Sequence, residues 1–426
     1  MIQGMNIREL EVLVTEEKGW TDSFRCGVER LRKQRGGTLY VPAGEYFTCS
    51  IQLFSHINLH LEQGAVLRFL DDHGLYEVVE EEFEGIMGRM YMPCIYASDA
   101  EDVSVTGQGM IDGQGKRWWK EWKGMECARP YLICFRRCRH VLLEGVRLVN
   151  SPAWTVHPLY CEDVRIHGIS IKNPADSPNT DGIDPDGSRN VRISDCLIDV
   201  GDDCIAIKAG TEETKQLVPC ENIVITNCNM VHGHGGIVIG SEMSGGVRNV
   251  AVSNCVFQDT DRGIRLKTRR RRGGSMERLS FQNIIMDRVM CPFTFNMYYY
   301  CGHNGKERYV WEKVPYPVDE TTPAVRDVLI HNVTVYGASA AAGFFYGLPE
   351  SPIERVTISN TTVCMDPEGE EGQPAMMGQM EPMKGHGFYL RFVKGLTMSQ
   401  VRVEHVQGDV VDGDDTVEVD WMDSRK

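Results

Sequence analysis

Three acidic residues are spaced in a way that suits acid and base chemistry. Asp181 lies in NTDGIDPDG, and Asp202 and Asp203 lie together in GDDCIAIKAG, 21 residues further on. Carboxyl groups that are crowded together repel one another, which raises the pKa of at least one and lets a protonated acid coexist with an ionised base. The hydrolysis of a glycosidic bond requires such a pair. Either motif alone is more often a solvated turn.

Basic side chains and a histidine follow the acids along the chain. His234 lies in HGHGGIVIGS, and Arg265 and Lys267 lie in RGIRLKT. Arg265 and Lys267 project to the same face of a strand because side chains alternate, so this pair could hold the carboxylate of an anionic sugar. His234 could instead bond a neighbouring backbone group. The four basic residues Arg269–Arg272 would ordinarily be a solvated loop, or they would extend the positive field of the pair.

A repeat of alternating apolar residues around a Gly, Asn or Asp must position these groups. Ten copies begin at Val103, Val141, Val164, Val191, Ile223, Val250, Leu279, Val328, Val356 and Leu396. One such coil cannot bury its own face, whereas stacked coils can. The sequence therefore predicts an all-β fold, a right-handed parallel β-helix of about ten coils. A turn ladder is expected at Asn227, Asn254, Asn283, Asn332 and Asn360. The alternative, an antiparallel β-sandwich, rarely repeats one local pattern ten times.

The organisation expected is a single domain, in which residues 1–37 form an N-terminal segment and cap, 38–405 the coils and 406–426 the C-terminal end. A helix is predicted over 21–35, with Thr21 or Asp22 as its N-cap and apolar residues at helical spacing. Four stretches lack the repeat and are expected to be loops that build the binding face: 71–92, 116–129, 301–322 and 366–385.

The composition narrows the function further. With 45 Lys plus Arg against 60 Asp plus Glu, the net charge is -15, which argues against a nucleic-acid partner. The sequence contains no run of eighteen apolar residues, so no membrane-spanning helix is predicted. The first residues also lack the basic segment followed by an apolar segment that is typical of a signal peptide. A cytoplasmic location is therefore expected. The 15 cysteines lack the paired spacing of a zinc site, so they are expected to be small hydrophobic residues buried in the core. No metal or cofactor is expected for this protein.

Four motifs together resemble a known family. NTDGID, GDDCIAIK, GHGG with IGS, and RLK, in that order, resemble the signatures of the family 28 glycoside hydrolases, the polygalacturonases of pectin breakdown. The resemblance covers roughly residues 19–300 and includes SPAWTVHP from Ser151. It implies inverting hydrolysis of α-1,4-galacturonosyl linkages, with Asp202 as the general acid and Asp181 with Asp203 activating water.

The same resemblance implies roles for further residues. His234 would tune the proton of the acid. The substrate-binding residues would be Asn179, His157, Arg265, Lys267 and Tyr299, with Tyr300 as the alternative to Tyr299. In one respect the chain departs from the family: one more residue, Gly235 or Gly236, lies between the histidine and IGS.

The string IGSEMSGGVRNV from Ile239 resembles the exo-acting bacterial members of the family. The expected substrate is an oligogalacturonide or another pectic chain, and the insertions at 71–92 and 301–322 would close one end of a pocket. Three alternatives stay open: a hydrolase of rhamnogalacturonan or substituted galacturonan with the same fold, a calcium-assisted pectate lyase, and a non-catalytic glycan-binding β-helix. The sequence leaves the oligomeric state open.

Overall fold

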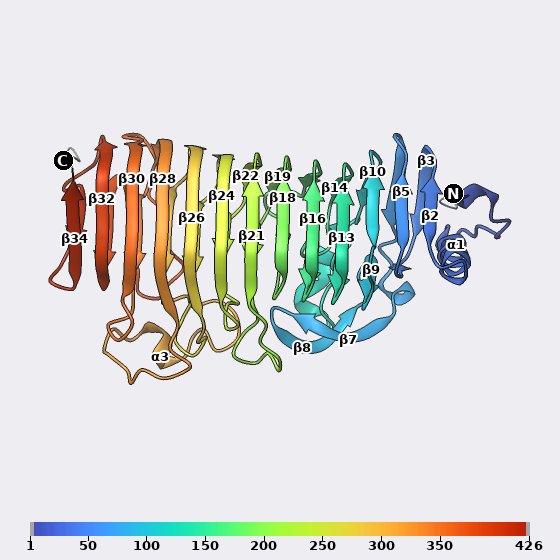
Figure 1. Ribbon diagram of the computed structural model, residues 1–426, viewed down its shortest axis with the longest axis horizontal. Coiled ribbons are helices and arrows are strands. Elements are labelled where there is room, and N and C mark those ends of the chain that lie inside the picture. The colour runs from blue at the N-terminus through green and yellow to red at the C-terminus, as the bar shows by residue number, and fades with distance from the viewer. Residues whose placement is uncertain (1–3, 423–426) are drawn as a thin grey trace. The chain divides into compact units, whose positions relative to one another are not determined.

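The computed structural model describes residues 4–422, and the chain divides into two compact units, Met1–Asp202 (unit 1) and Asp203–Lys426 (unit 2). Within each unit the strands pair in parallel with the equivalent strands of the coils before and after (Figure 1). The hairpin β7–β8 is an antiparallel pair. Parallel pairing through both units excludes the antiparallel sandwich.

Unit 1 contains three rows of parallel strands. The first row is β1 (Gly4–Asn6), β2 (Gly37–Val41), β5 (Ile57–Leu61), β10 (Ser104–Gly107), β13 (Arg139–Glu144), β16 (Glu162–His167) and β18 (Arg189–Ser194). The second is β3 (Gly44–Thr48), β6 (Ala65–Phe69), β11 (Met110–Asp112), β14 (Arg147–Val149), β17 (Ser170–Lys172) and β19 (Leu197–Val200). The third is β4 (Ile51–Leu53), β9 (Ile95–Ser98), β12 (Ile133–Arg136) and β15 (Val156–Leu159).

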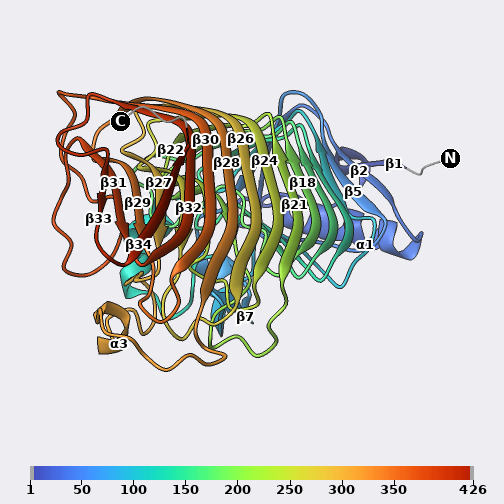
Figure 2. The same cartoon turned by 60° about the vertical axis from the view of Figure 1, so that its left-hand side comes forward.

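Unit 2 contains two long rows of parallel strands. One row is β21 (Cys220–Thr226), β24 (Val247–Gln258), β26 (Ser275–Asp287), β28 (Ala324–Ala338), β30 (Ile353–Met365), β32 (Val393–Glu404) and β34 (Val417–Met422), and β22 (Asn229–His232) pairs with the end of β24 (Figure 2). The other is β20 (Asp203–Ile207), β23 (Gly235–Ile239), β25 (Arg262–Lys267), β27 (Cys291–Asn296), β29 (Ala341–Tyr346), β31 (His386–Arg391) and β33 (Val411–Gly413).

In unit 1 each copy of the repeat found in the sequence covers a first-row strand and the second-row strand that follows it, and in unit 2 the copies lie in the row that runs from β21 to β34. The alternation within the repeat sets the core. In unit 2, Val250 pairs with Leu279, Leu279 with Val328, and Val328 with Val356, and all four side chains are buried. Each fully buried aliphatic side chain contributes about 1.5 to 3 kcal/mol, so stacked rows of them hold one coil on the next.

The predicted asparagine ladder is confirmed in unit 2. Asn283, Asn332 and Asn360 each donate from Nδ2 to Oδ1 of the asparagine one coil before, at 3.2, 2.8 and 3.0 Å. Each residue of the ladder has a φ between 47° and 56°, a left-handed conformation that asparagine tolerates better than most residues. The ladder therefore bends every coil at the same place.

The predicted helix is present as α1 (Thr21–Lys33), which buries Phe24, Val28 and Leu31 against β2 and β4. The N-cap prediction is wrong: the helix starts after Trp20, and no side chain caps it. Thr21 instead donates its hydroxyl to the Lys18 carbonyl, and its oxygen accepts from the Cys49 N–H at 2.9 Å rather than from an N–H of the helix. The role of α1 as a cap, the number of coils and the single domain remain predictions. Parts of the predicted terminal segments, 1–3 and 423–426, lie outside the described residues.

Three of the four insertions contain more structure than plain loops. Residues 71–92 form η2 (His73–Leu75) and the hairpin of β7 (Val78–Phe83) and β8 (Ile86–Tyr91). Residues 116–129 form α2 (Lys116–Glu121) and η3 (Trp122–Gly124), and 301–322 contain the short helix α3 (Arg308–Trp311). A further turn, η1 (Ile7–Glu9), precedes α1.

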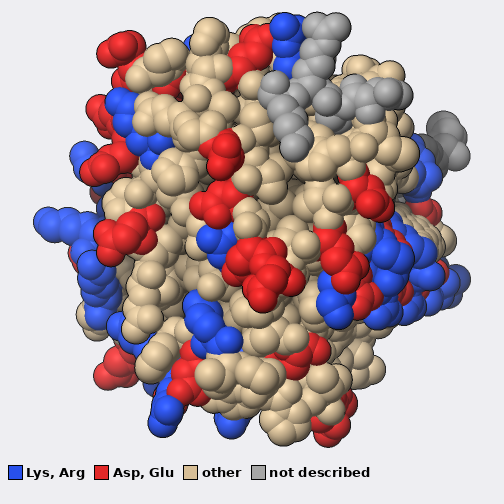
Figure 3. All heavy atoms as spheres, turned by 90° about the vertical axis from the view of Figure 1, so that its left-hand side faces the viewer, with Lys and Arg blue, Asp and Glu red and all other residues tan. Residues whose placement is uncertain are grey.

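Charged side chains lie on the surface of unit 2, whereas most of the cysteines lie in the core. At the end of unit 2, acidic and basic side chains are intermixed with uncharged ones (Figure 3). Of the 15 cysteines 12 are buried, as predicted for small hydrophobic residues. Among residues 4–422, every helix is too short or too polar to cross a membrane.

Candidate active site

In unit 1, backbone pairing positions Asp181. The backbone at 181–183 runs beside β15: Thr155 donates its N–H to the Asp181 carbonyl at 2.9 Å, and Val156 donates to the Gly182 carbonyl at 3.0 Å. Asp181 thus continues the third row of strands by one coil, and its side chain is buried.

Asp202, the last residue of unit 1, follows β19 after a close turn. A Cβ atom at Gly201 would lie 2.5 Å from the Ser177 carbonyl oxygen, so a larger residue would push this turn away. Within the unit, a carboxylate oxygen of Asp181 lies within 4.8 Å of one of Asp202. The structure therefore brings these two predicted acids together.

Arg129 lies beside both acids and was missed in the sequence. Its side chain is buried, and it donates from Nη2 to Asn179 Oδ1 at 2.7 Å. Burial lowers the pKa of Arg129 to about 10, while the charges of Glu84, Asp181 and Asp202 act in the opposite direction. Arg129 lies outside the recognised motifs, so no signal in the sequence singled it out.

His157, predicted to bind substrate, is a packed residue in unit 1. It is 1% exposed, and its ring meets those of Tyr131 and Trp154 edge-on, with centroids 4.6 and 5.0 Å away. Its Nε2 lies 3.6 Å from Oδ2 of the buried Asp186. The aromatic rings cover the imidazole, so the prediction of a direct substrate contact is not supported.

In unit 2, Asp203 joins the two predicted cations. Arg265 donates from Nη1 to Asp203 Oδ1 at 2.9 Å, and Lys267 donates from Nζ to Oδ2 at 2.7 Å. All three side chains, called here the Asp203 trio, are buried. Burial by itself would raise the pKa of Asp203, but Lys267 and Arg265 outweigh it and hold that pKa well below its usual range. Asp203 is therefore a carboxylate at neutral pH.

The extra glycine lets Arg265 reach Asp203. Gly235 pairs with Asp203, and Val238 pairs with Arg265 in unbroken register, so β23 lies between the two charged residues. A Cβ atom at Gly235 would lie 3.3 Å from Arg265 Cδ and from Asp203 Oδ1, and 2.5 Å from a Val238 methyl group. His234 directly precedes β23 and is partly exposed.

Tyr299 and a loop border the Asp203 trio within unit 2. Lys267 Nζ lies 5.1 Å and Arg265 Cζ 5.9 Å from the centroid of the Tyr299 ring. Burial raises the pKa of Tyr299 well above its ordinary value, so it stays a neutral phenol. From the insertion at 366–385, Met376 accepts from Arg265 Nη2 through its sulfur at 2.9 Å. Tyr299, not Tyr300, is thus the tyrosine whose ring faces the cations.

The run Arg269–Arg272 is a correction to the expected solvated loop, since all but Arg271 are buried. Arg269 and Arg272 both pair with Glu212, and these three residues are called the Glu212 trio. Arg269 also donates to the carbonyls of Cys301, at 2.8 Å, and His303. These arginines therefore fasten the insertion at 301–322.

A second buried ion pair also lies in unit 2, between Lys208 Nζ and Glu242 Oε2 at 3.2 Å. Burial would raise the pKa of Glu242, but Lys208 above all, with Arg272 and Lys267, lowers it to about 2. Both residues lie inside motifs that were recognised, GDDCIAIK and IGSEMSGG, without a role being assigned to them.

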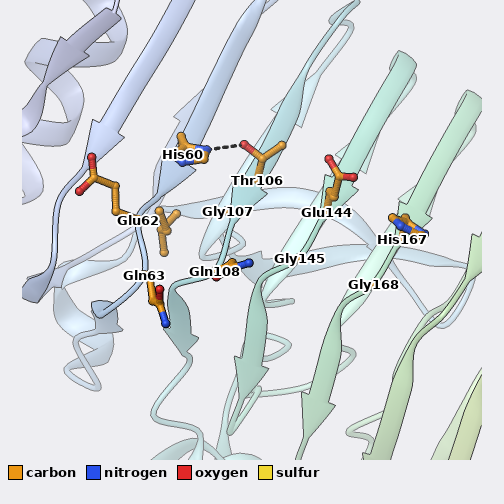
Figure 4. A pocket seen from close by; sticks show the side chains of 11 residues that line it. His60, Glu62, Gln63, Thr106, Gly107, Gln108, Glu144, Gly145, His167 and Gly168 are labelled. Carbon is orange, nitrogen blue, oxygen red and sulfur yellow. Dashed lines mark hydrogen bonds between the residues drawn. The ribbon is translucent and has the colours of Figure 1, made fainter.

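An open groove lies elsewhere in unit 1. It has a volume of about 710 Å³ and is lined by the polar ends of neighbouring strands, including His60, Thr106, Glu144 and His167 (Figure 4). His60 Nδ1 and Thr106 Oγ1 are hydrogen-bonded at 2.9 Å. None of the predicted site residues lines this groove, so its size does not identify the chemistry.

Known proteins are similar to this chain over much of its length. The model of the glycosyl hydrolases family 28 matches residues 84–370. A "probable polygalacturonase" of Vitis vinifera is 34% identical over 357 residues, which cover 80% of this chain and 70% of that protein. The chain spans about half the length of several further plant polygalacturonases.

Two solved structures are similar over most of the chain. An exopolygalacturonase from Thermotoga maritima has a TM-score of 0.79 and 31% identity, covering 95% of this chain and 93% of that one. A family 28 exopolygalacturonase from Yersinia enterocolitica has a TM-score of 0.78 at 19% identity, covering 100% and 78%, which shows the fold alone. The right-handed parallel β-helix is thereby confirmed, and the chain belongs to family 28 of the glycosyl hydrolases, as a glycoside hydrolase.

Proposed function

We propose that this enzyme hydrolyses α-1,4-galacturonosyl linkages of pectin-derived oligogalacturonides from a chain end. The observation that carries the proposal is the Asp203 trio: two buried cations share one buried carboxylate. A guanidinium and an ammonium group side by side are the donors that bind carboxylates most strongly, so they favour an anionic partner. The carboxylate of a galacturonate residue is such a partner.

The catalytic roles proposed follow the family resemblance. Asp202 donates the proton to the leaving oxygen, and Asp181 with Asp203 activates the attacking water. The depressed pKa of Asp203 keeps this carboxylate ionised, so it can accept a hydrogen bond from the attacking water and is excluded as the proton donor. His234 tunes the acid, while Arg265, Lys267 and Asn179 bind the uronate and Tyr299 lies against the sugar. No metal or cofactor has a part in this proposal.

The stereochemical course is the sharpest test of these roles. Inverting enzymes generally keep their carboxyl groups about 6.5 to 9.5 Å apart, and retaining enzymes about 5 to 5.5 Å. The closest oxygens of Asp181 and Asp202, within 4.8 Å, approach the second class. Proton NMR of the first product decides: inversion yields the β-anomer, whereas the α-anomer would make one of these residues a nucleophile.

Two segments support action at a chain end. In unit 1 the β7–β8 hairpin is seated by Phe83, whose ring stacks on Tyr131 and Trp154, with centroids 5.8 and 5.7 Å away. In unit 2 the segment around Pro374 and Met376 lies over β27, accepting hydrogen bonds from Thr294 and Asn296. Each segment is proposed as a wall; the second was not predicted for this role.

The product pattern tests the proposal directly. Polygalacturonate and trigalacturonide are digested and sampled over time. Release of monomer or dimer alone from the outset supports exo-action, whereas a ladder of products means endo-action. Cleavage of rhamnogalacturonan in preference to both would replace the substrate assignment. A product that absorbs in the ultraviolet, formed only without EDTA, would indicate a lyase.

A location inside the cell is part of the same proposal. The burial of 12 of the 15 cysteines as core residues supports a reducing compartment, where thiols need no partner. Fractionation of cells that express the natural gene, with detection of the enzyme in each fraction, tests it. Recovery outside the cytoplasm would overturn this part alone.

A further inference from the structure

Arg129 connects two turns of unit 1. From Nη1 it donates to the carbonyls of Pro152 and Pro178, both at 2.8 Å, and from Nη2 to Asn179 Oδ1. The second turn leads directly into Asp181. One side chain from the segment before β12 therefore braces the backbone that carries a proposed catalytic residue.

The contact with Asn179 sets the direction of its amide. Asn179 has a φ of 53°, a left-handed conformation that its neighbours must hold in place. Because the guanidinium can only donate, the amide group must turn Oδ1 toward Arg129 and present its NH₂ group on the other side. A hydrogen-bond donor suits the hydroxyl and carboxylate oxygens of a uronate.

Arg129 also carries charge next to three carboxylates. Glu84, from the turn of the β7–β8 hairpin, and the acids Asp181 and Asp202 all stabilise its cationic form. With a pKa of about 10, the guanidinium stays protonated at neutral pH despite its burial. The two acids are thus arranged around a fixed positive charge.

Arg129 is not placed to contact the substrate directly. Arg129 is 3% exposed, and both terminal nitrogens already donate to protein oxygens. We propose that Arg129 is a positioning residue of the active site, which fixes the turn of Asn179 and Asp181 and determines that the amide nitrogen of Asn179 faces the substrate. This inference rests on the proposed function.

A double-mutant cycle tests it. Arg129→Gln and Asn179→Ala are made singly and together, and kcat and KM are measured on trigalacturonide. Because misplacing a substrate-binding group costs up to about a hundredfold, Arg129→Gln should lower kcat/KM by roughly 10- to 100-fold. If Arg129 acts through Asn179, the double variant should be at most about threefold worse than Asn179→Ala.

A matched control separates positioning from general stability. Arg270 is likewise buried, and it fastens the 301–322 insertion through the carbonyls of Tyr309, Glu312 and Val314. These partners of Arg270 all lie within unit 2, so Arg270→Gln and Asn179→Ala should combine multiplicatively. Multiplicative behaviour of Arg129→Gln with Asn179→Ala would overturn the inference, as would kcat/KM of Arg129→Gln within twofold of wild type.

Arg129→Lys keeps the experiment decisive if Arg129→Gln does not fold. Lysine retains the charge but has no second nitrogen to donate to Asn179 while the first donates to the two carbonyls, so kcat/KM should recover in part while the coupling to Asn179 weakens. Full coupling with full activity in Arg129→Lys would contradict the amide-setting role. If the wild type cleaves rhamnogalacturonan but not galacturonides, the proposed substrate fails, and the same cycle is measured on the substrate that is cleaved.

Discussion

The Asp203 trio and the Glu212 trio of unit 2 have the same charges but different surroundings. Each consists of one carboxylate that binds two cations, and the cations of both trios are buried. Beyond Glu212, Arg269 donates to backbone carbonyls of Cys301 and His303, which are good acceptors. Beyond Asp203, Arg265 donates to the sulfur of Met376, a weak acceptor that a carboxylate can displace.

This difference teaches that buried positive charge does not by itself mark a binding site. In the Glu212 trio, Arg269 donates to backbone carbonyls of the protein and so fastens a loop. The Asp203 trio also makes weaker contacts, with a thioether and with the face of the Tyr299 ring. Four predictions test the contrast.

The largest effect is expected from removing the carboxylate of each trio. Asp203→Asn should lower kcat by at least about a hundredfold, because a base is lost, and should also destabilise the fold by leaving two buried cations unpaired. Glu212→Gln should lower the melting temperature similarly but keep kcat within about tenfold. Steady-state kinetics with thermal melts check this; equal losses of kcat would erase the functional difference between the trios.

The next effect concerns one cation of each trio. Lys267→Met should lower kcat/KM on di- and trigalacturonide by about 10- to 100-fold, since a charge-assisted contact is worth roughly 1.5 to 3 kcal/mol. The matched variant Arg272→Met should change kcat/KM by less than about threefold. Substrates with reduced carboxyl groups should not distinguish Lys267→Met from wild type. Equal sensitivity to both variants would speak against a uronate at the Asp203 trio.

A third cation, Lys313, sharpens the comparison because burial lowers its pKa to about 7, assisted by Arg270. Its Nζ lies 3.2 Å from the centroid of the Tyr298 ring. The unfolded chain binds more protons than the folded one between about pH 7 and the ordinary lysine pKa of about 10.5, so stability rises with pH over this window.

Lys313→Met should therefore raise the melting temperature at pH 6, by roughly 2 to 4 °C, and the gain should fade toward pH 10. Calorimetric melts at both pH values, with Lys313→Arg as a variant that keeps the charge, measure it. A gain that is equal at pH 6 and pH 10 would mean that packing, not charge, is responsible.

The smallest effect is expected at Arg271, the exposed member of the arginine run. Its Cζ lies 4.2 Å from the centroid of the Tyr309 ring, a contact worth about 0.5 to 1 kcal/mol at an exposed position. Arg271→Ala should leave kcat/KM on trigalacturonide within twofold at all salt concentrations. A fall that disappears at high salt would show that the arginine run does steer the anionic substrate.

The repeat and the asparagine ladder could be read from the sequence because each depends on alternation within one strand or on one turn residue. The prediction that Arg265 and Lys267 lie on one face was correct. Their joint contact with Asp203 was not predictable, because it depends on the absence of a side chain at Gly235. The roles of Asp181, Asp202 and His234 remain predictions.

The errors at the arginine run and at Arg129 share one physical cause. Arg269 and Arg272 were expected in solvent because a run of like charges is costly to bury, yet Glu212, 57 and 60 residues away in the sequence, compensates them. Arg129 was overlooked for the same reason, since its partners Pro178 and Asn179 lie some 50 residues further on. Local patterns contain no information about such partners.

The unbroken register from Asp203 through Gly235 to the strand of Arg265 has a consequence for how such enzymes diversify. Strand pairing, together with the missing side chain at Gly235, determines where these groups meet, so the corner segments between strands can lengthen, shorten or be exchanged without moving the reacting groups. Selection can thus remodel what the pocket admits, coil by coil, on chemistry that stays in place. Lineages of this fold should differ most in their corners and least in residues such as Gly235.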